Sequence, residues 1–235
     1  MELSKRIYAV ASLVTTGNRI ADIGTDHAYI PIFLIQKQHI PSAIAMDVND
    51  GPLMRATEHI REYALEDRIE TRLSDGFQEL KAGEADTAII AGMGGNLVIR
   101  ILKEHWNITC SLKECVLQPQ SEIAKVRAFL LEEGFLFIEE DMALDDEKYY
   151  PMMKVVPPSQ KRNPEVWTET QLRFGKLLLE KQHPVLYQYL QREERIHRQI
   201  LKSLESKDGE RIEERKRELE EELLHIREGL EYYEV

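Results

Sequence analysis

The feature that most constrains the fold is an alternation of short β-branched runs with helical patterns between Arg19 and about Pro157. Strands that alternate with helices are typical of a parallel sheet with helices packed on its faces. The candidate strands are residues 19–24, 42–48, 69–75, 86–92 and 114–119. The candidate helices are residues 3–14, 31–37, 52–65, 96–104 and 122–133. The sequence therefore predicts an α/β domain built on a parallel sheet.

The end of this region has a different pattern. Residues 134–144 and 148–157 are two further strand candidates, and only the polar turn Asp145-Asp146-Glu147 separates them. Two strands joined by so short a connection must run antiparallel, because a parallel pair needs a long crossover. The sheet is therefore expected to end in an antiparallel hairpin.

After Pro157-Pro158 the pattern becomes helical, over about 168–182, 184–206 and 210–232. Apolar residues in the last two segments recur at spacings of three, four and seven, which is the pattern of a coiled-coil hairpin. The two stripes are Ile212, Leu219, Leu223, Ile226 and Leu230, and Leu186, Leu190, Ile196, Ile200 and Leu204. We expect one domain over 1–160 and a helical coiled-coil extension over 161–235. A helical appendage that only packs or dimerises the protein is the alternative.

The formal net charge of −11 is unevenly distributed. Residues 1–160 carry 16 basic and 25 acidic side chains, whereas residues 161–217 carry 14 basic and 10 acidic ones. An acidic total argues against indiscriminate binding of nucleic acid, but a local basic face can still hold it. The extension is the part of the chain where such a face is expected.

The sequence also bears on the compartment of the protein and on whether it binds a metal. No apolar run approaches the roughly 20 residues that cross a bilayer, and the N-terminus lacks the apolar stretch of a signal peptide,. Cys110 and Cys115 lack the spacing of a zinc site with other cysteines or histidines,. We therefore expect a cytoplasmic protein with no membrane association and no metal, and a monomer.

The stretch ADIGTDHAYIP, residues 21–31, follows the first predicted strand and holds one glycine, Gly24. A dinucleotide or P-loop turn needs more glycines, and Asp26 beside a pyrophosphate would be repelled. S-adenosylmethionine has no phosphate and carries a positive sulfonium, so acidic side chains are favourable around it. In this interpretation Gly24 lets the backbone approach the methionine part and Asp22 receives its amino group.

Acidic residues also end the next two predicted strands. Asp47 lies 23 positions after Gly24, where an acid can accept both ribose hydroxyls,. Asp75 could accept the adenine amino group, and Gly76 would leave room for the ring. A solvated aspartate is the alternative for each position alone, but three acids at one sheet edge form a more specific pattern.

These motifs together resemble the bacterial tRNA (adenine-N1)-methyltransferases that modify adenine 22 of tRNA. The motifs in family order are ADIGTDHAYIP (21–31), AIAMDVN (43–49) with Gly51-Pro52, Asp75-Gly76, IIAGMGGN (89–96), LQPQ (117–120) and RFG (173–175). The likeness covers nearly the whole chain. Two positions depart from the family pattern: Gln120 replaces an asparagine, and Asp47 replaces a common glutamate.

The resemblance implies a class I, Rossmann-like methyltransferase with a helical extension, an S-adenosylmethionine cofactor and a tRNA substrate. It implies a cofactor site at Asp22, Gly24, Asp47, Asp75, Gly76, Ala91 and Gly92. It also implies a substrate-facing set of His27, Gly94, Gly95, Gln118, Pro119 and Gln120. A chain with AGMGG (91–95) instead of the Asn/Asp-Pro-Pro-aromatic motif of amino-methylating enzymes favours a ring nitrogen as target. A tight turn without a ligand remains the alternative for these glycines.

Methyl transfer to adenine N1 needs position and charge more than acid–base chemistry, because N1 is unprotonated at neutral pH. Asp26 is the predicted partner of the N6 amine and of the developing positive charge, and Tyr29 the predicted stacking wall. A core aromatic is the alternative for Tyr29. His27 could contact RNA, although a structural hydrogen bond is the preferred interpretation.

Binding of tRNA is predicted on the extension. Arg195 and Arg198, with Arg192 and Lys202, recur at three- and four-residue spacing along one helix face,. A solvated face balanced by acidic neighbours is the alternative. Two other functions stay open: a methyltransferase with another substrate, and a non-enzymatic coiled-coil adaptor with a relic cofactor domain.

Overall fold

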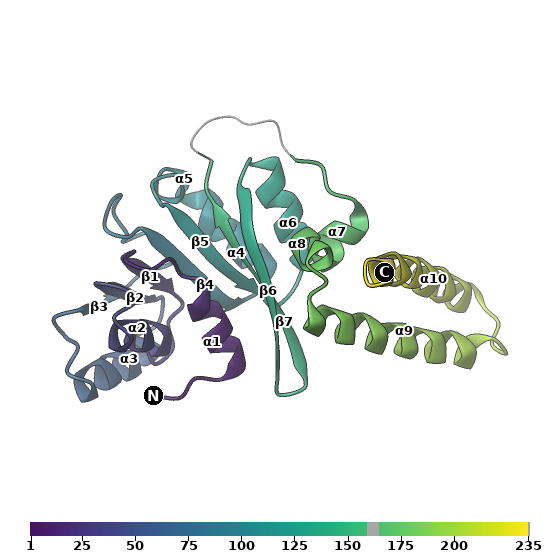
Figure 1. Ribbon diagram of the computed structural model, residues 1–235, viewed down its shortest axis with the longest axis horizontal. Coiled ribbons are helices and arrows are strands. Elements are labelled where there is room, and N and C mark those ends of the chain that lie inside the picture. The colour runs from purple at the N-terminus through teal and green to yellow at the C-terminus, as the bar shows by residue number, and fades with distance from the viewer. Residues whose placement is uncertain (159–164, 235) are drawn as a thin grey trace. The chain divides into compact units, whose positions relative to one another are not determined.

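The computed structural model describes residues 1–158 and 165–234. The chain divides into two compact units, Met1–Glu165 and Val166–Val235 (Figure 1). The expected domain boundary between residues 160 and 161 lies outside the described residues. Among the described residues, no helix is both long and apolar enough to span a bilayer.

The first unit contains a seven-stranded sheet in the order β3-β2-β1-β4-β5-β7-β6. Its strands are β1 (Ile20–Ile23), β2 (Ala43–Asp47), β3 (Ile69–Leu73), β4 (Thr87–Met93), β5 (Glu114–Pro119), β6 (Leu136–Asp145) and β7 (Lys148–Val156). The first five strands pair in parallel, and β7 pairs antiparallel with β5 and β6. The predicted parallel sheet with a terminal antiparallel hairpin is confirmed.

The strand order reverses between β1 and β4, which are neighbours at the centre of the sheet. All four residues of β1 are buried, as expected for a central strand that helices cover on both faces,. Connections leave β1 and β4 in opposite directions at this point, so their carboxyl ends leave a crevice in which open α/β sheets bind ligands. The fold thus places any ligand beside the residues that follow β1 and β4.

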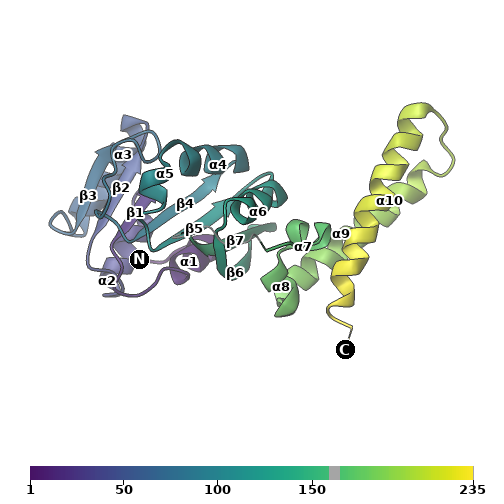
Figure 2. The same ribbon diagram turned by 90° about the horizontal axis from the view of Figure 1, so that it is seen from above.

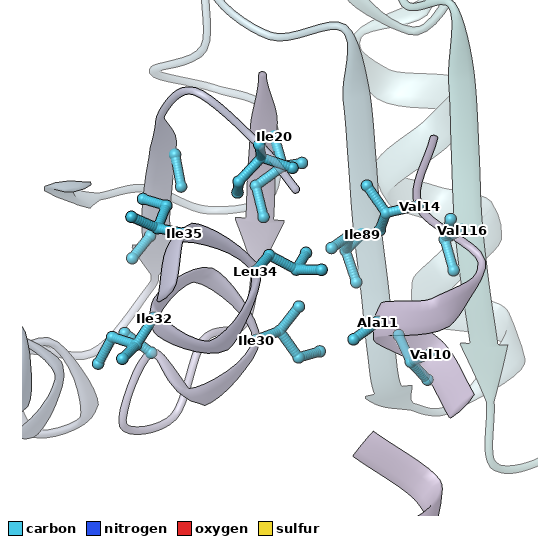
Figure 3. Close-up of a cluster of buried hydrophobic side chains, with 14 of the residues drawn as sticks. Val10, Ala11, Val14, Ile20, Ile30, Ile32, Leu34, Ile35, Ile89 and Val116 are labelled. Carbon is cyan, nitrogen blue, oxygen red and sulfur yellow. The ribbon is translucent and has the colours of Figure 1, made fainter. Parts of the chain in front are cut away.

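Three helices, α1 (Lys5–Ser12), α2 (Tyr29–Gln36) and α3 (Asp50–Glu62), contribute to one buried cluster. The sequence predicts a helix from residue 3, but α1 begins at Lys5, because the Ser4 hydroxyl caps it by accepting from the backbone N–H of Ile7,. In Figure 3 the side chains of Ala11, Ile30, Leu34 and Ile89 point toward one another, so α1 and α2 meet over β4. α2 is almost wholly apolar, and this burial fixes the turn that precedes it.

The remaining helices of this unit are α4 (Gly95–Glu104), α5 (Trp106–Thr109) and α6 (Ile123–Glu132). α4 and α6 lie side by side, and α4 also packs on β4 and β5 (Figures 1 and 2). α6 carries Arg127, which forms an ion pair with Glu140 of β6 at 2.8 Å, and both side chains are fully buried. α4 begins two residues after β4 ends, so its first turn lies beside the crevice.

The second unit consists of α7 (Glu169–Phe174), α8 (Lys176–Glu180), α9 (Pro184–Leu204) and α10 (Glu210–Glu231). The prediction of one helix over 168–182 was wrong, because Gly175 at φ +93° separates α7 from α8,. α9 and α10 pack against each other, and a Cβ on Gly229 of α10 would lie 3.2 Å from Leu190 of α9. A helical hairpin is therefore present, while supercoiling of its helices stays a prediction.

The two predicted apolar stripes differ in burial along their length. The buried members are Leu186, Leu190, Leu219, Leu223 and Ile226. The other members, Ile196, Ile200, Leu204, Ile212 and Leu230, are half-buried. The apolar contact between α9 and α10 is thus most deeply buried in the region where α7 also packs on α10.

Candidate active site

A cleft of about 520 Å³ lies beside the carboxyl ends of β1 and β4, where the topology predicts a ligand site,. Its volume lies in the range typical of small-molecule sites. Eight predicted site residues line it: Asp22, Gly24, Asp26, His27, Tyr29, Ala91, Gly92 and Gln120. The N-terminal segment and the start of α1 contribute Glu2, Leu3, Ser4, Arg6 and Ile7.

The turn after β1 has an unusual backbone. Gly24, His27 and Ala28 have φ values of +75°, +66° and +54°, a region that non-glycine residues rarely adopt,. A side chain at Gly24 would also collide with the terminal methyl group of Met93. Such a strained turn persists only where its surroundings hold it, and such strain is concentrated at functional sites.

Asp22, the third residue of β1, places a carboxylate on the cleft while its side chain is buried. Burial raises the pKa of Asp22 to about 6, the Thr25 hydroxyl partly offsets this shift, and the charge of Asp47 adds to it,. A carboxylate held in so poorly hydrated a position gains stability from a cation that binds beside it. The site is thus prepared for an ammonium or sulfonium group.

Asp26 is exposed and is held by an arginine of α3. Its Oδ1 accepts from Nη2 of Arg55 at 2.8 Å and from Nε at 3.1 Å, and Nε2 of His27 lies 3.4 Å away. Among the described residues, Oδ2 of Asp26 has no hydrogen-bond donor. Arg55 therefore orients the carboxylate and offsets part of its charge, while Oδ2 remains available to an amine.

Three rings stack at the start of α2. The His27 and Tyr29 rings are 5.1 Å apart and nearly parallel, and the His59 ring lies 4.8 Å from that of His27. Nδ1 of His59 donates to the backbone oxygen of His27 at 3.1 Å, since a carbonyl can only accept,. Within the described chain, Nδ1 of His27 is buried without a hydrogen-bond partner. The histidines thus support Tyr29, which is 39% exposed and faces the cleft.

The other two predicted acids lie at the adjacent strand ends but do not line this cleft. Asp47, the last residue of β2, accepts from the backbone N–H of Asn49 at 2.8 Å, and its backbone oxygen accepts from Ser74. Asp75 accepts from Nη2 of Arg100 at 3.0 Å. Gly76 is buried at φ +56°, and a Cβ there would lie 3.0 Å from Ile101. These residues extend the same sheet edge beyond the cleft.

The AGMGG motif contains a β-bulge and a helix start. The pairing of β4 with β5 shifts between Ala91 and Met93, and Gly92 in the bulge has φ +81° and faces the cleft,. Gly94 precedes α4, and Gly95 is its first residue. A Cβ on Gly95 would lie 2.5 Å from the backbone oxygen of Ser121, well inside van der Waals contact, so this glycine serves packing. Only the first half of the motif reaches the cleft.

The three residues at the end of LQPQ are placed differently from one another. Gln118 and Pro119 are buried, and Oε1 of Gln118 accepts from Nη1 of Arg6 at 3.0 Å. Gln120 is exposed, lines the cleft, and its backbone N–H donates to Met93. Gln118 therefore reaches the cleft only through Arg6.

The predicted tRNA-binding arginines lie in the second unit, on α9. Arg195 and Arg198 are both exposed. Arg198 is paired with Glu194 at 2.5 Å, the arrangement of a balanced solvated face, while no described ion pair involves Arg195. Both side chains are accessible to a ligand.

Four residues that sequence reasoning missed support the site: Arg6, Arg55, His59 and Arg100. All four are polar residues on helices. Each contacts a predicted site residue at least 25 positions away in the sequence, and Arg6 and Gln118 are 112 positions apart. The i, i+4 spacing of Arg55 and His59 was a signal that both share one helix face. Nothing in the sequence indicated what that face contacts.

The fold and the cleft together define a class I S-adenosylmethionine-dependent methyltransferase. The strand order, with its reversed last strand, belongs to that architecture, and the buried Asp22 carboxylate fits a cationic cofactor better than a phosphate. The chain belongs to the tRNA (adenine(22)-N(1))-methyltransferase family, whose profile matches residues 20–228.

Individual relatives agree with this assignment. The tRNA (adenine(22)-N(1))-methyltransferase of Bacillus subtilis is 35% identical over 153 residues, which are 65% of this chain and 64% of that protein. A Streptococcus pneumoniae structure, provisionally assigned as a tRNA (m1A22) methyltransferase and bound to S-adenosyl-L-methionine, has a TM-score of 0.85 at 30% identity. That alignment covers 97% of this chain and all of that one.

A Mycoplasma capricolum enzyme of the same family, in complex with S-adenosyl-homocysteine, has a TM-score of 0.82 at 26% identity. That alignment covers 99% of both chains. The likeness therefore extends over both units of the chain.

Proposed function

We propose that this protein transfers a methyl group from S-adenosylmethionine to N1 of adenine 22 in tRNA. The observation that carries the proposal is the cleft itself, which brings Asp22, Asp26 and Tyr29 together at the sheet crevice of a chain that belongs to this family. Because tRNA is the substrate, we place the reaction in the bacterial cytoplasm. We further propose that a monomer suffices, since one cleft contains the groups the reaction requires.

The cofactor supplies a methyl group on a positively charged sulfur. Asp22 receives its amino group in the buried part of the cleft, where an incoming cation relieves the cost of the desolvated carboxylate,. Asp47 accepts the ribose hydroxyls, and Asp75, oriented by Arg100, accepts the adenine amine beside Gly76,. Gly24, Ala91 and Gly92 line the same cleft at the ends of β1 and β4, where their backbone can contact the ligand.

The target adenine needs placement rather than activation. Its N1 lone pair is free at neutral pH, so no general base is required, but pairing must be broken before N1 is accessible. Tyr29 provides the wall on which the unpaired base stacks, with His27 behind it,. Oδ2 of Asp26 accepts from the N6 amine and stabilises the positive charge that methylation creates on the ring.

The helical unit supplies the surface that holds the rest of the tRNA. Its exposed arginines on α9, including Arg195 and Arg198, are suited to contacts with phosphates that lie away from the target adenine,. This division leaves chemistry to the first unit and orientation of the substrate to the second.

The direct test is methyl transfer to defined transcripts. The purified protein is incubated with methyl-labelled S-adenosylmethionine and a tRNA transcript, and the modified nucleoside is identified and mapped by mass spectrometry. We expect 1-methyladenosine at position 22 and no transfer to a matched transcript with guanine at that position. Methylation of the guanine-22 transcript at another nucleotide would contradict the position, and methylation of protein only would contradict the substrate.

A further inference from the structure

Among the described residues that line the cleft, Arg6 is the only arginine or lysine. The other charged side chains there are the acids Glu2, Asp22 and Asp26. Acids favour the cationic cofactor but repel the phosphates that flank any nucleotide in RNA. A cation in this wall therefore needs an explanation that the cofactor does not give.

The guanidinium of Arg6 is held in place by uncharged groups. Nη1 donates to Oε1 of Gln118 at 3.0 Å, and Cζ lies 5.4 Å from the centre of the Tyr150 ring. The backbone N–H of Arg6, not its guanidinium, donates to Asp145 at 3.1 Å. Other arginines at this edge of the sheet are neutralised directly: Arg55 pairs with Asp26 and Arg100 with Asp75. Among the described residues, no carboxylate pairs with the guanidinium of Arg6, although Asp145 lies close enough that, besides the backbone hydrogen bond, the charge of Arg6 helps to lower its pKa.

The amide that holds Arg6 is itself fixed. Gln118 is fully buried, and its Nε2 donates to the backbone oxygen of Pro119 at 3.1 Å, which leaves Oε1 directed at Arg6. Gly92 lies beside the guanidinium, and a Cβ there would come within 3.4 Å of Nη1. The buried acceptor Oε1 of Gln118 thus holds the guanidinium at the wall of the cleft.

A guanidinium has five N–H donors in a planar fork that matches the oxygens of a phosphate. Within the described residues, the guanidinium of Arg6 donates one hydrogen bond, to Gln118. The remaining donors are available to a ligand in the cleft. A prearranged fork of this kind gives a charge-assisted contact without the cost of ordering a free side chain.

We propose that Arg6 binds a phosphate adjacent to the target adenine and that Gln118 is the residue that positions it. The proposal rests on the proposed function, since it takes RNA as the substrate. It assigns Gln118 a role in substrate binding that acts through Arg6, in place of the direct contact expected from its motif.

The test compares three variants with one matched control. Arg6→Gln removes the cleft cation, Arg6→Lys keeps the charge without the fork, and Gln118→Met removes the positioning acceptor. Lys5→Gln is the control, because Lys5 is the neighbouring exposed cation on α1 and does not line the cleft. For each protein we measure the dissociation constant of tRNA at several salt concentrations, the KM and kcat for tRNA, and cofactor affinity by calorimetry.

Arg6→Gln should raise KM for tRNA about tenfold or more, as expected for loss of a charge-assisted hydrogen bond. It should also make the plot of log affinity against log salt concentration less steep, by the amount expected for the loss of about one phosphate contact. Gln118→Met and Arg6→Lys should raise KM less and keep the wild-type slope, since the charge remains. Cofactor affinity should stay unchanged in all four proteins, which also shows that they fold.

Two results would overturn the proposal. In one, Arg6→Gln has the same tRNA affinity and salt slope as Lys5→Gln. In the other, Arg6→Gln loses cofactor affinity and keeps its tRNA affinity, which would assign Arg6 to the cofactor. The wild-type protein separates this proposal from the proposed function: if it methylates no tRNA, the function fails; if it does and Arg6→Gln is unaffected, only the role of Arg6 fails.

Discussion

The two units of this protein use polar residues in opposite ways. The first unit buries polar side chains, among them Asp22 and Gln118, and directs them at one cleft or its supports. In the second unit Thr170 is the one buried polar residue among the described residues, and the charged side chains pair mostly on the surface, as Arg198 does with Glu194. Strand ends of a sheet can fix several side chains around one point, whereas a helical hairpin offers a long face.

This difference indicates that the chemistry depends on the first unit and that affinity for tRNA depends on the second. Groups held in a poorly hydrated cleft interact strongly with a bound charge, because little water screens them. Exposed arginines on α9 are screened by solvent and salt, so each contributes modestly to binding. Changes in the first unit should therefore be specific and large, and those in the second graded and salt-dependent.

Removal of residues 166–235 should have the largest effect. We expect S-adenosylmethionine binding by the remaining unit to persist and tRNA methylation to fall below detection, because the surface that orients the tRNA is gone. Calorimetry and a methyl-transfer assay measure the two properties separately. If the shortened protein methylates tRNA at the full rate, the helical unit is only a packing or dimerisation element.

Asp22→Asn should stabilise the ligand-free protein while it weakens cofactor binding. Burial raises the pKa of Asp22 from 3.8 to about 6, so the folded state binds more protons than the unfolded state between these values,. The wild-type free energy of unfolding therefore falls as pH rises from about 4 to about 6. At pH 7 the ionised form costs on the order of 3 kcal/mol, which the variant avoids.

Thermal unfolding at pH 4 and pH 7 tests this prediction. The melting temperature of Asp22→Asn should exceed that of the wild type at pH 7 and approach it at pH 4. Asp86→Asn is the matched control of opposite sign, because Arg19 holds the pKa of Asp86 below its usual range and the variant loses that ion pair. Equal destabilisation by both substitutions at pH 7 would show that Asp22 is not a strained carboxylate.

Asp47→Ala should weaken S-adenosylmethionine binding by roughly 1.5–3 kcal/mol, the value of a charged hydrogen bond to the ribose. The fold should survive, because Asp47 is half-exposed at the end of β2 and, among the described residues, its side chain accepts only a local bond from Asn49. Calorimetry with the cofactor measures the change. Unchanged affinity would remove Asp47 from the cofactor site.

Tyr29→Ala should lower methyl transfer by roughly 1–3 kcal/mol in kcat/KM for tRNA, the range found for loss of one stacking partner of a base. Tyr29→Phe keeps the ring and should be mild. Cofactor affinity is the control, and it should change in neither variant. Wild-type kinetics in Tyr29→Ala would contradict the stacking wall and leave Tyr29 as a packing residue.

The smallest expected effect is that of Arg195→Glu combined with Arg198→Glu on α9. Affinity for tRNA should decrease, and cofactor affinity should not change. The plot of log tRNA affinity against log salt concentration should become less steep, by the amount expected for the loss of up to about two phosphate contacts. Glu194 loses its partner Arg198 in this variant, so Glu194→Gln serves as a control for that ion pair. An unchanged salt slope would place the tRNA on another surface.

The sequence by itself determined the order and type of most elements. The strand at 114–119 was predicted to the residue, and the other strand ends differ by two positions at most, because β-branched runs and helical periodicity act over short distances,. The glycine of ADIGTDHAYIP and the acids at three strand ends were equally local signals. The break at Gly175 was missed, because one glycine within a helical pattern does not by itself show that the chain turns there,.

Tertiary structure alone decided how the site residues are held. Arg55 reaches Asp26, His59 reaches the carbonyl of His27, and Arg6 reaches Gln118 across 112 positions of sequence. Each contact forms because helices laid on a sheet bring side chains of distant segments together, and no periodicity within a segment records what its polar face will contact. The raised pKa of Asp22 has the same origin, since burial of that carboxylate exists only once the sheet and its helices are packed,.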